Sequence, residues 1–200
     1  MQGIMSVCFG LVALTGQPTF VPVGNEDGVA LYARKGGAAV DMMAVGIVEA
    51  PPAEVQALLL DYDNYGRINP RLAESRVLSR GPHELVAFQR LKLPVIKDRV
   101  YLLRVTWRSQ PHRSDIRFAL AGKPETGVDT IAMPVLQGHW ELESIREGAA
   151  TRVVYTVQMA LGEGVPNSLV GDGAVRELPM LFKNLRRLVK DHHAALALHH

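Results

Sequence analysis

The chain has 200 residues, of which 48% are apolar and 21% charged, and its formal net charge is +2. This length allows one sizeable hydrophobic core but is short for two, and the composition is that of a globular protein rather than a disordered one. A near-neutral chain whose basic residues are spread along its length has no broad electrostatic attraction for nucleic acid, so we expect no nucleic-acid partner.

The first 27 residues are predicted to stand apart from the folded domain. Cys8 is the single cysteine, which excludes an internal disulfide and a zinc site built from several cysteines. It lies in the apolar stretch 4–14, which is too short to span a bilayer but suits the core of a signal peptide. No lysine or arginine precedes this stretch and no clear cleavage site follows it. Despite these two missing features, the apolar stretch leads us to predict a periplasmic or secreted location, with a cytoplasmic one as the alternative. Residues 17–27 are expected to form a linker.

A hairpin and a short helix are predicted next. The segments 29–34 and 40–49 are strand candidates separated by a glycine turn, which favours a hairpin. Residues 51–54 read Pro-Pro-Ala-Glu and begin a helix, because proline suits the first helical turn and glutamate the positive end of the helix dipole. We expect this helix to end around residues 61–64.

Alternating segments then predict a run of strands. Apolar and polar residues alternate with the period of two that is typical of a strand with one buried face. Short links between these segments favour an antiparallel meander. The predicted strands are 75–79, 85–93, 98–109, 115–121, 131–145 and 151–161.

The period becomes helical from Asn167 to about residue 198, with an apolar stripe and a basic face. Pro179 is expected to dent or restart this helix, and the part after it is about 25 Å long at 1.5 Å per residue, which is enough to cross a sheet. A strongly twisted sheet of this size curls. Because one helix is not expected to fill the concave side with its own side chains, we predict an apolar cavity between helix and sheet.

Several motifs occur in an order that points to a known family. Residues 49–52 read Glu-Ala-Pro-Pro before a helix, residues 138–142 read Gly-His-Trp-Glu-Leu, and the turn 162–166 precedes the closing helix. Across about residues 28–193, these motifs together resemble the START-like branch of the helix-grip superfamily. The resemblance implies an α+β helix-grip fold for residues 28–198, in which a curved antiparallel sheet wraps around the long C-terminal helix.

The resemblance also implies binding of a lipid, a sterol or another hydrophobic small molecule without turnover. We expect the ligand to lie between the sheet and the last helix, with its affinity coming mainly from buried apolar area. Ligand access is expected through the loops around 68–70, 123–130 and 162–166. The predicted ligand-binding residues are Tyr101, Leu103, Val105, Trp107, Phe118, Trp140, Leu178, Leu181, Phe182 and Leu185.

No motif for catalysis or metal binding is present in the sequence. The chain has no His-Glu-x-x-His helix, no Gly-x-Ser-x-Gly elbow and no phosphate-binding glycine loop. By the alternation, Glu141 and Glu143 point away from Trp140. We therefore predict a protein that is not an enzyme, with no catalytic residue, no metal and no cofactor.

Three functions remain open at this point. The first is a carrier of a hydrophobic small molecule, including its transfer between membranes through transient membrane contact. The second is an enzyme of the polyketide cyclase or aromatase type, which belongs to the same superfamily and needs a polar catalytic side chain in the cavity. The third is a module that binds a protein partner in an exposed apolar groove.

Overall fold

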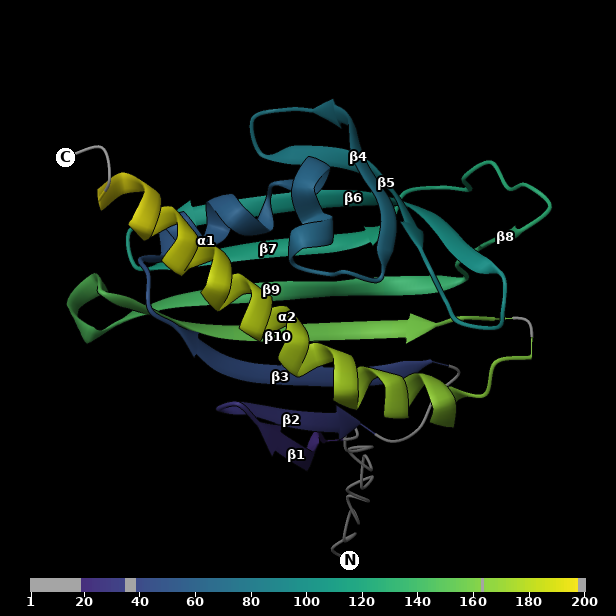
Figure 1. The fold of residues 1–200 in the computed structure, drawn as a ribbon, viewed down its shortest axis with the longest axis horizontal. Helices are drawn as coiled ribbons and strands as arrows, with labels where there is room; N and C mark the ends of the chain where they lie inside the picture. The colour runs from purple at the N-terminus through teal and green to yellow at the C-terminus, as the bar shows by residue number, and fades with distance from the viewer. Residues whose placement is uncertain (1–18, 35–38, 163, 198–200) are drawn as a thin grey trace, which may run out of the picture.

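The computed structural model describes residues 19–34, 39–162 and 164–197. They form one mainly antiparallel sheet with a long helix across it (Figure 1). The elements are β1 (Val21–Glu26), β2 (Val29–Arg34), β3 (Val40–Val48), α1 (Pro52–Leu59), the 3-10 helix η1 (Tyr62–Arg67), β4 (Leu72–Arg80), β5 (Glu84–Leu91), β6 (Asp98–Gln110), β7 (Arg113–Leu120), β8 (Thr130–Ala132), β9 (Val135–Ile145), η2 (Arg146–Gly148), β10 (Ala150–Ala160) and α2 (Asn167–Ala197).

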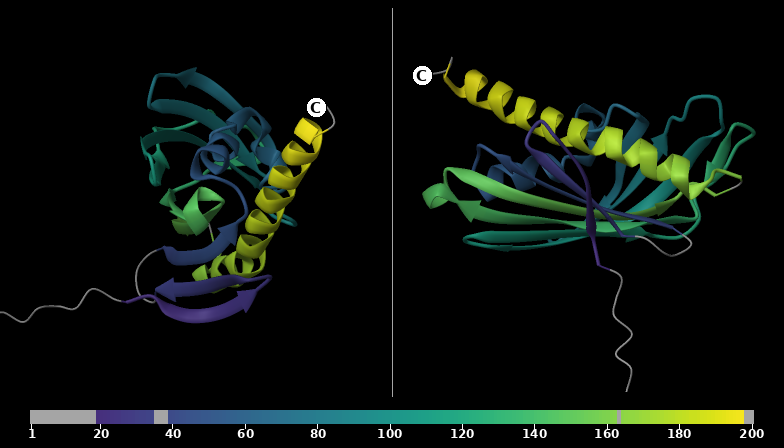
Figure 2. Two further views of the ribbon diagram at one scale, coloured as in Figure 1. Left: turned by 90° about the vertical axis from the view of Figure 1, so that its left-hand side faces the viewer. Right: turned by 90° about the horizontal axis from the view of Figure 1, so that it is seen from below.

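The predicted meander and the predicted fold class are both confirmed. The strand order is β1-β2-β3-β10-β9-β7-β6-β5-β4, so the last strand pairs with both β9 and β3 and joins the first hairpin to the meander. Figure 2 shows that the sheet is curved and that α2 lies along its concave side. Residues 1–18 lie outside the described residues, so the signal-peptide and localisation predictions are not tested by the structure.

The predicted linker is wrong over residues 21–26, which form β1 and pair antiparallel with β2. The turn between the two strands is Asp27-Gly28, and both residues have a positive φ, +51° and +70°. Two left-handed residues in succession are what a two-residue hairpin turn requires, and Asp-Gly is a favoured sequence for it. All residues of β1 are exposed, so the strand has no buried face that a pattern of apolar and polar residues could predict. The Asp-Gly turn was the sequence feature that indicated a hairpin here.

The predicted strand 131–145 is divided in two. Thr130–Ala132 forms the short β8, which pairs with β6 in parallel, and β9 starts at Val135. The break falls at Met133-Pro134, where the proline has no N–H to donate to a neighbouring strand.

Two helix ends also differ from the prediction. The helix α1 ends at Leu59 rather than around 61–64, and η1 occupies the segment expected to be its exit. The helix α2 continues through Pro179, so the expected restart does not occur.

The position of α2 depends on a glycine in β3. A Cβ atom at Gly46 would lie 2.8 Å from Cδ1 of Phe182, whose ring is fully buried. On the same side of α2, Arg186 donates from Nε to the carbonyl oxygen of Ile47 at 2.8 Å and from a terminal nitrogen to that of Asp27 at 2.7 Å. The absence of a side chain at Gly46 thus allows α2 to approach β3 closely, and the hydrogen bonds of Arg186 hold the helix in that position.

We predict that Gly46→Ala lowers the free energy of unfolding by about 1–3 kcal/mol, because the new methyl group overpacks against a ring that has no space to move. Gly173→Ala is the matched control, since a Cβ there meets no atom within 4 Å. This control should raise stability by about 0.5–1 kcal/mol through helix propensity. Urea unfolding followed by circular dichroism measures both, and equal stability of the two variants would contradict this role of Gly46.

Candidate ligand pocket

A narrow pocket lies inside the curve of the sheet, and we call it the inner pocket. Its volume is about 100 Å³. Its wall combines side chains of η1, of the concave face of the sheet and of α2. The lining residues are Tyr62, Tyr65, Asn69, Gln89, Leu91, Tyr101, Leu103, Phe118, Met133, Leu136, Tyr155, Met159 and Leu181.

Four of the ten predicted ligand-binding residues line this pocket, namely Tyr101, Leu103, Phe118 and Leu181. Five others are buried in the core behind its wall. Trp140 is one of these, because its ring stacks on that of Tyr155 with 4.0 Å between centroids and approaches Phe182 from the other side. The remaining four are Val105, Leu178, Phe182 and Leu185.

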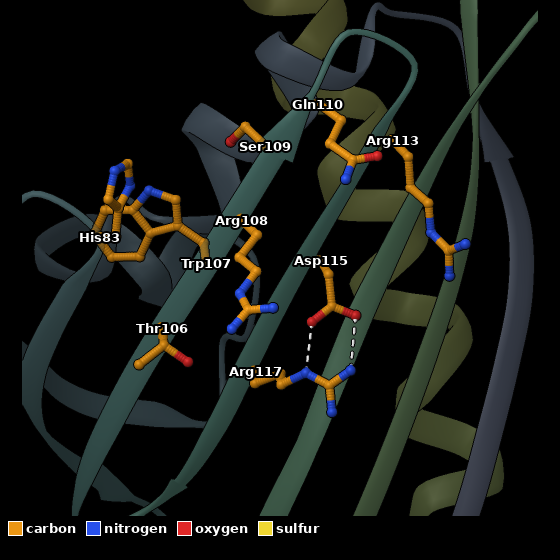
Figure 3. A pocket seen from close by; sticks show the side chains of 9 residues that line it. All are labelled: His83, Thr106, Trp107, Arg108, Ser109, Gln110, Arg113, Asp115 and Arg117. Atoms are coloured by element: carbon orange, nitrogen blue, oxygen red, sulfur yellow. Dashed lines mark hydrogen bonds and ion pairs between the residues drawn. The ribbon is translucent and has the colours of Figure 1, made fainter.

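Trp107 lies away from the inner pocket. The pairing of β5 with β6 ends at Glu84, which lies opposite Thr106, so Trp107 and the residues after it extend past the end of β5. There the Trp107 ring is half-buried and meets the His83 ring edge-on (Figure 3). The alternation of apolar and polar residues predicts the face of the strand on which Trp107 lies, but it gives no information about where along the strand the pocket ends.

Sequence reasoning missed most of the tyrosines in the pocket. Tyr62 and Tyr65 are three residues apart, so one turn of η1 presents both to the interior, where their rings stack at 4.7 Å. The sequence pattern predicts only the end of a helix and its exit turn here. The spacing of two tyrosines within an otherwise polar stretch was the available signal.

Burial determines the ionisation of these phenols. It raises the pKa of Tyr62, Tyr65, Tyr101 and Tyr155 above the ordinary tyrosine value, because the charged phenolate would lose its hydration. For Tyr62 and Tyr155 the neighbouring phenols raise the pKa further, whereas the indole of Trp140 opposes the rise at Tyr65. All four hydroxyl groups are therefore neutral near pH 7.

Hydrogen bonds hold η1 in place over the sheet. Ser75 of β4 donates to the backbone carbonyl of Tyr62 and accepts from Nε2 of Gln89 at 2.9 Å. Asn184 of α2 is buried and donates from Nδ2 to the carbonyl oxygen of Ile68 at 3.0 Å. These contacts connect β4, β5 and α2 to the segment that carries two of the pocket's phenols.

A buried arginine joins two backbone segments where several loops meet. Arg99 is 1% exposed and donates from Nε to the carbonyl oxygen of Leu161 at 2.6 Å and from a terminal nitrogen to that of Lys97 at 2.5 Å. The first acceptor precedes the β10–α2 turn and the second lies in the β5–β6 loop. Figure 1 shows these two connections on the same side of the molecule as β8, and we call this side the loop end.

Comparison with known proteins gives the family. The family model described as polyketide cyclase / dehydrase and lipid transport matches residues 48–186. The chain belongs to this polyketide cyclase/dehydrase and lipid transport family. No curated protein sequence matches it significantly.

Solved structures show the same fold at low identity. A STAR-related lipid transfer protein from Xanthomonas axonopodis aligns with a TM-score of 0.76 at 16% identity, covering 86% of this chain and 98% of that one. Human STARD10 aligns at 0.75 and 12% identity, covering 89% and 77%. The Zhui aromatase/cyclase from Streptomyces sp. R1128 aligns at 0.53 and 16%, covering 74% and 94%. The family thus joins proteins named for lipid transfer and for cyclisation.

The interior of this family member is more filled than the sequence led us to expect. Ligand sites for small molecules usually enclose about 300–1,000 Å³, whereas the inner pocket encloses about 100 Å³. The helix α2 does not fill the concave side alone, because α1 and η1 also bury side chains there. The stacked Trp140 and Tyr155 rings and the adjacent Phe182 ring occupy further volume. A larger guest requires α2 or the loop end to move outward.

The outer face of the sheet carries open, polar hollows instead. One of about 910 Å³ is bordered by arginines of β6 and β7, and Arg117 donates to Asp115 across 2.7 Å within it (Figure 3). On β9, His139 accepts or donates toward Thr156 at 2.7 Å and toward Glu141 at 3.1 Å. As expected, Glu141 thus points away from Trp140. These groups form hydrogen-bonded pairs within β7 and β9 and between β9 and β10 rather than an enclosed site.

Metal ligands and membrane spans were searched among the described residues. No three histidine, cysteine or acidic side chains come together there as a metal site would need. Within the same residues, neither helix combines the length and the apolar composition that crossing a bilayer demands.

We predict that the four buried phenols ionise only when the protein unfolds. Their folded-state pKa lies above the unfolded value of about 10, so below that pH both states are protonated and stability does not change through these groups. Above it the unfolded chain releases protons that the folded chain keeps, so the free energy of unfolding falls as pH rises. Phenolate absorbance and near-ultraviolet circular dichroism should change together, and gradual ionisation of these tyrosines in a folded protein would contradict a dry pocket.

Proposed function

We propose that the chain binds a lipid or a comparable hydrophobic small molecule in the inner pocket, without catalysis, and passes it between membranes. The observation that carries this proposal is the pocket itself, which is enclosed by the sheet, η1 and α2 and lined mainly by apolar and aromatic side chains. Its binding free energy comes from apolar area removed from water, about 25 cal/mol per Å². The family description and the lipid-transfer name of the Xanthomonas axonopodis neighbour support the same class of function.

Opening of the pocket is proposed to occur at the loop end. Leu91, Met133 and Met159 line the pocket and lie at the ends of the strands that lead into the loops there. Two of the three loops expected to give access, 123–130 and 162–166, belong to this end. The Arg99 hydrogen bonds join the β5–β6 loop to the start of the β10–α2 turn, so breaking them would free both segments at once.

The loop end also carries an exposed apolar surface suited to a bilayer. Val95 and Ile96 of the β5–β6 loop, Val128 of the β7–β8 loop and Leu169 of the first turn of α2 are all exposed. Val95 has φ +70°, which is unfavourable for a β-branched residue and holds its side chain fully in solvent. Apolar side chains on loop tips insert into the interfacial layer of a membrane at little cost.

Charge contributes less than apolar contact at this surface. The loops carry three exposed lysines, Lys92, Lys97 and Lys123, but also two exposed carboxylates, Glu125 and Asp129. The net charge there is small, so we expect docking to neutral phosphatidylcholine vesicles with weak dependence on salt.

A cyclase or aromatase activity in the same pocket is the second candidate. Similarity to the Zhui aromatase/cyclase favours it, since aromatic rings and hydroxyl groups line the pocket here as well. General acid–base catalysis needs a group whose pKa lies near the working pH. The titratable groups that line the described pocket are phenols with raised pKa values, which favours binding over catalysis. Turnover of a linear poly-β-ketone, abolished in Tyr65→Phe, would favour the enzyme instead.

Ligand occupancy is tested by narrowing the pocket. Native mass spectrometry of the protein purified from cells should show a bound hydrophobic molecule. Leu181→Trp fills the pocket and should reduce that occupancy at least tenfold. Met180→Trp is the matched control, because this neighbouring side chain is 41% exposed and points out of α2. Wild-type protein that is empty after screening against lipid extracts would contradict the proposal.

Membrane docking is tested at the loop tips. We predict that Val95→Asp combined with Val128→Asp lowers the vesicle-bound fraction at least tenfold, because two apolar insertions are lost and two charges are added. Leu78→Asp is the control, since Leu78 is 45% exposed on β4, close to the β4–β5 turn at the other end of the sheet. Vesicle flotation measures binding, and equal binding of the double variant and the control would exclude docking through this end.

A further inference from the structure

The inner pocket combines ring faces and hydrogen-bonding groups with a complete lack of formal charge. Its thirteen lining residues include four tyrosines, one phenylalanine and two amides, and no Asp, Glu, Lys, Arg or His is among them. Ring faces offer stacking surface, and neutral hydroxyl and amide groups both donate and accept hydrogen bonds. The wall of the pocket therefore carries separate hydroxyl and amide groups that can form hydrogen bonds, but it carries no charged group.

The buried arginine on the same strand is not part of the pocket wall. Arg99 lies two residues before Tyr101 on β6 and is buried, but two of its nitrogens already donate to the carbonyl oxygens of Leu161 and Lys97. Its role is to hold two backbone segments together at the loop end. The inner pocket itself therefore offers an anionic guest no counter-charge on its wall.

An ionised guest would lose its hydration in this pocket without compensation. Burying a carboxylate or a phosphate away from water costs several kcal/mol unless a cation pairs with it. A hydroxyl or carbonyl group costs far less, and one hydrogen bond offsets that cost. The phenols also resist conversion to phenolates, because burial raises the pKa of Tyr101 and Tyr155.

We propose that the inner pocket selects an uncharged guest that carries apolar ring or chain surface and a hydrogen-bonding oxygen, and that it rejects ionised fatty acids and phosphate headgroups. This inference rests on the proposed binding function and names the class of molecule that is bound. The polar contacts come from the phenols of η1, β6 and β10, and the apolar contacts from the remaining wall.

The experiment compares probes that share a skeleton and differ in charge. At pH 7, 2-naphthol is neutral, 2-naphthoate is ionised and naphthalene has no polar group. Isothermal calorimetry should show 2-naphthol binding at least tenfold more tightly than 2-naphthoate. In Tyr101→Phe and Tyr155→Phe, affinity for 2-naphthol should fall about fivefold, which corresponds to one hydrogen bond, while affinity for naphthalene stays unchanged.

A gain-of-function variant provides the reciprocal test. Leu91→Lys places a cation at the pocket end of β5, where the side chain is only partly buried and its ammonium group can remain hydrated before ligand binds. Its affinity for 2-naphthoate should rise at least tenfold. Leu78→Lys adds the same charge to exposed β4 and should leave all three affinities unchanged.

The outcomes separate this inference from the function on which it rests. Equal affinities for 2-naphthol and 2-naphthoate, or a fatty acid as the molecule bound in native mass spectrometry, would overturn charge selection and leave hydrophobic binding standing. Absence of binding for every probe together with an empty purified protein would overturn both.

Discussion

Close contact between α2 and β3 is the constraint on which the rest of this molecule depends. Gly46 leaves room for the Phe182 ring, and Arg186 fixes the helix to the backbone of Ile47 and Asp27. The helix is thereby held against one flank of the curved sheet. The other flank, carrying β4 and β5, is reached through η1, which α2 contacts by the Asn184 hydrogen bond to Ile68. The inner pocket is the space that remains between these two attachments.

The small volume of that space is a consequence of aromatic packing. Tyr155 stacks on Trp140, which approaches Phe182, so a continuous set of rings runs from the pocket wall to the helix. Movement of α2 would change the contacts of all three rings together. The proposed opening at the loop end would couple ligand release to contact with a membrane.

Charge is distributed unevenly between the inside and the outside of the sheet. Arginines and carboxylates pair within and between strands of the outer face, whereas the described lining of the inner pocket is neutral. Arg99 is the buried exception, and its partners are backbone carbonyl groups rather than a guest. The family description names both cyclisation and lipid transport, and the neutral wall is the feature on which the proposed carrier function rests.

Local patterns in the sequence determined the strands, the closing helix and the fold class, because alternation and helical periodicity record which face of each element is buried. They also singled out Tyr101, Leu103, Phe118 and Leu181, which line the inner pocket. Tertiary structure alone decided the extent of the pocket. It depends on where along β6 the pocket ends, since Trp107 packs against the core without lining the pocket, on how η1 turns Tyr62 and Tyr65 inward, and on the volume left between rings from distant strands. Periodicity gives the face of a residue, but the space in front of that face is set by segments far away in the chain.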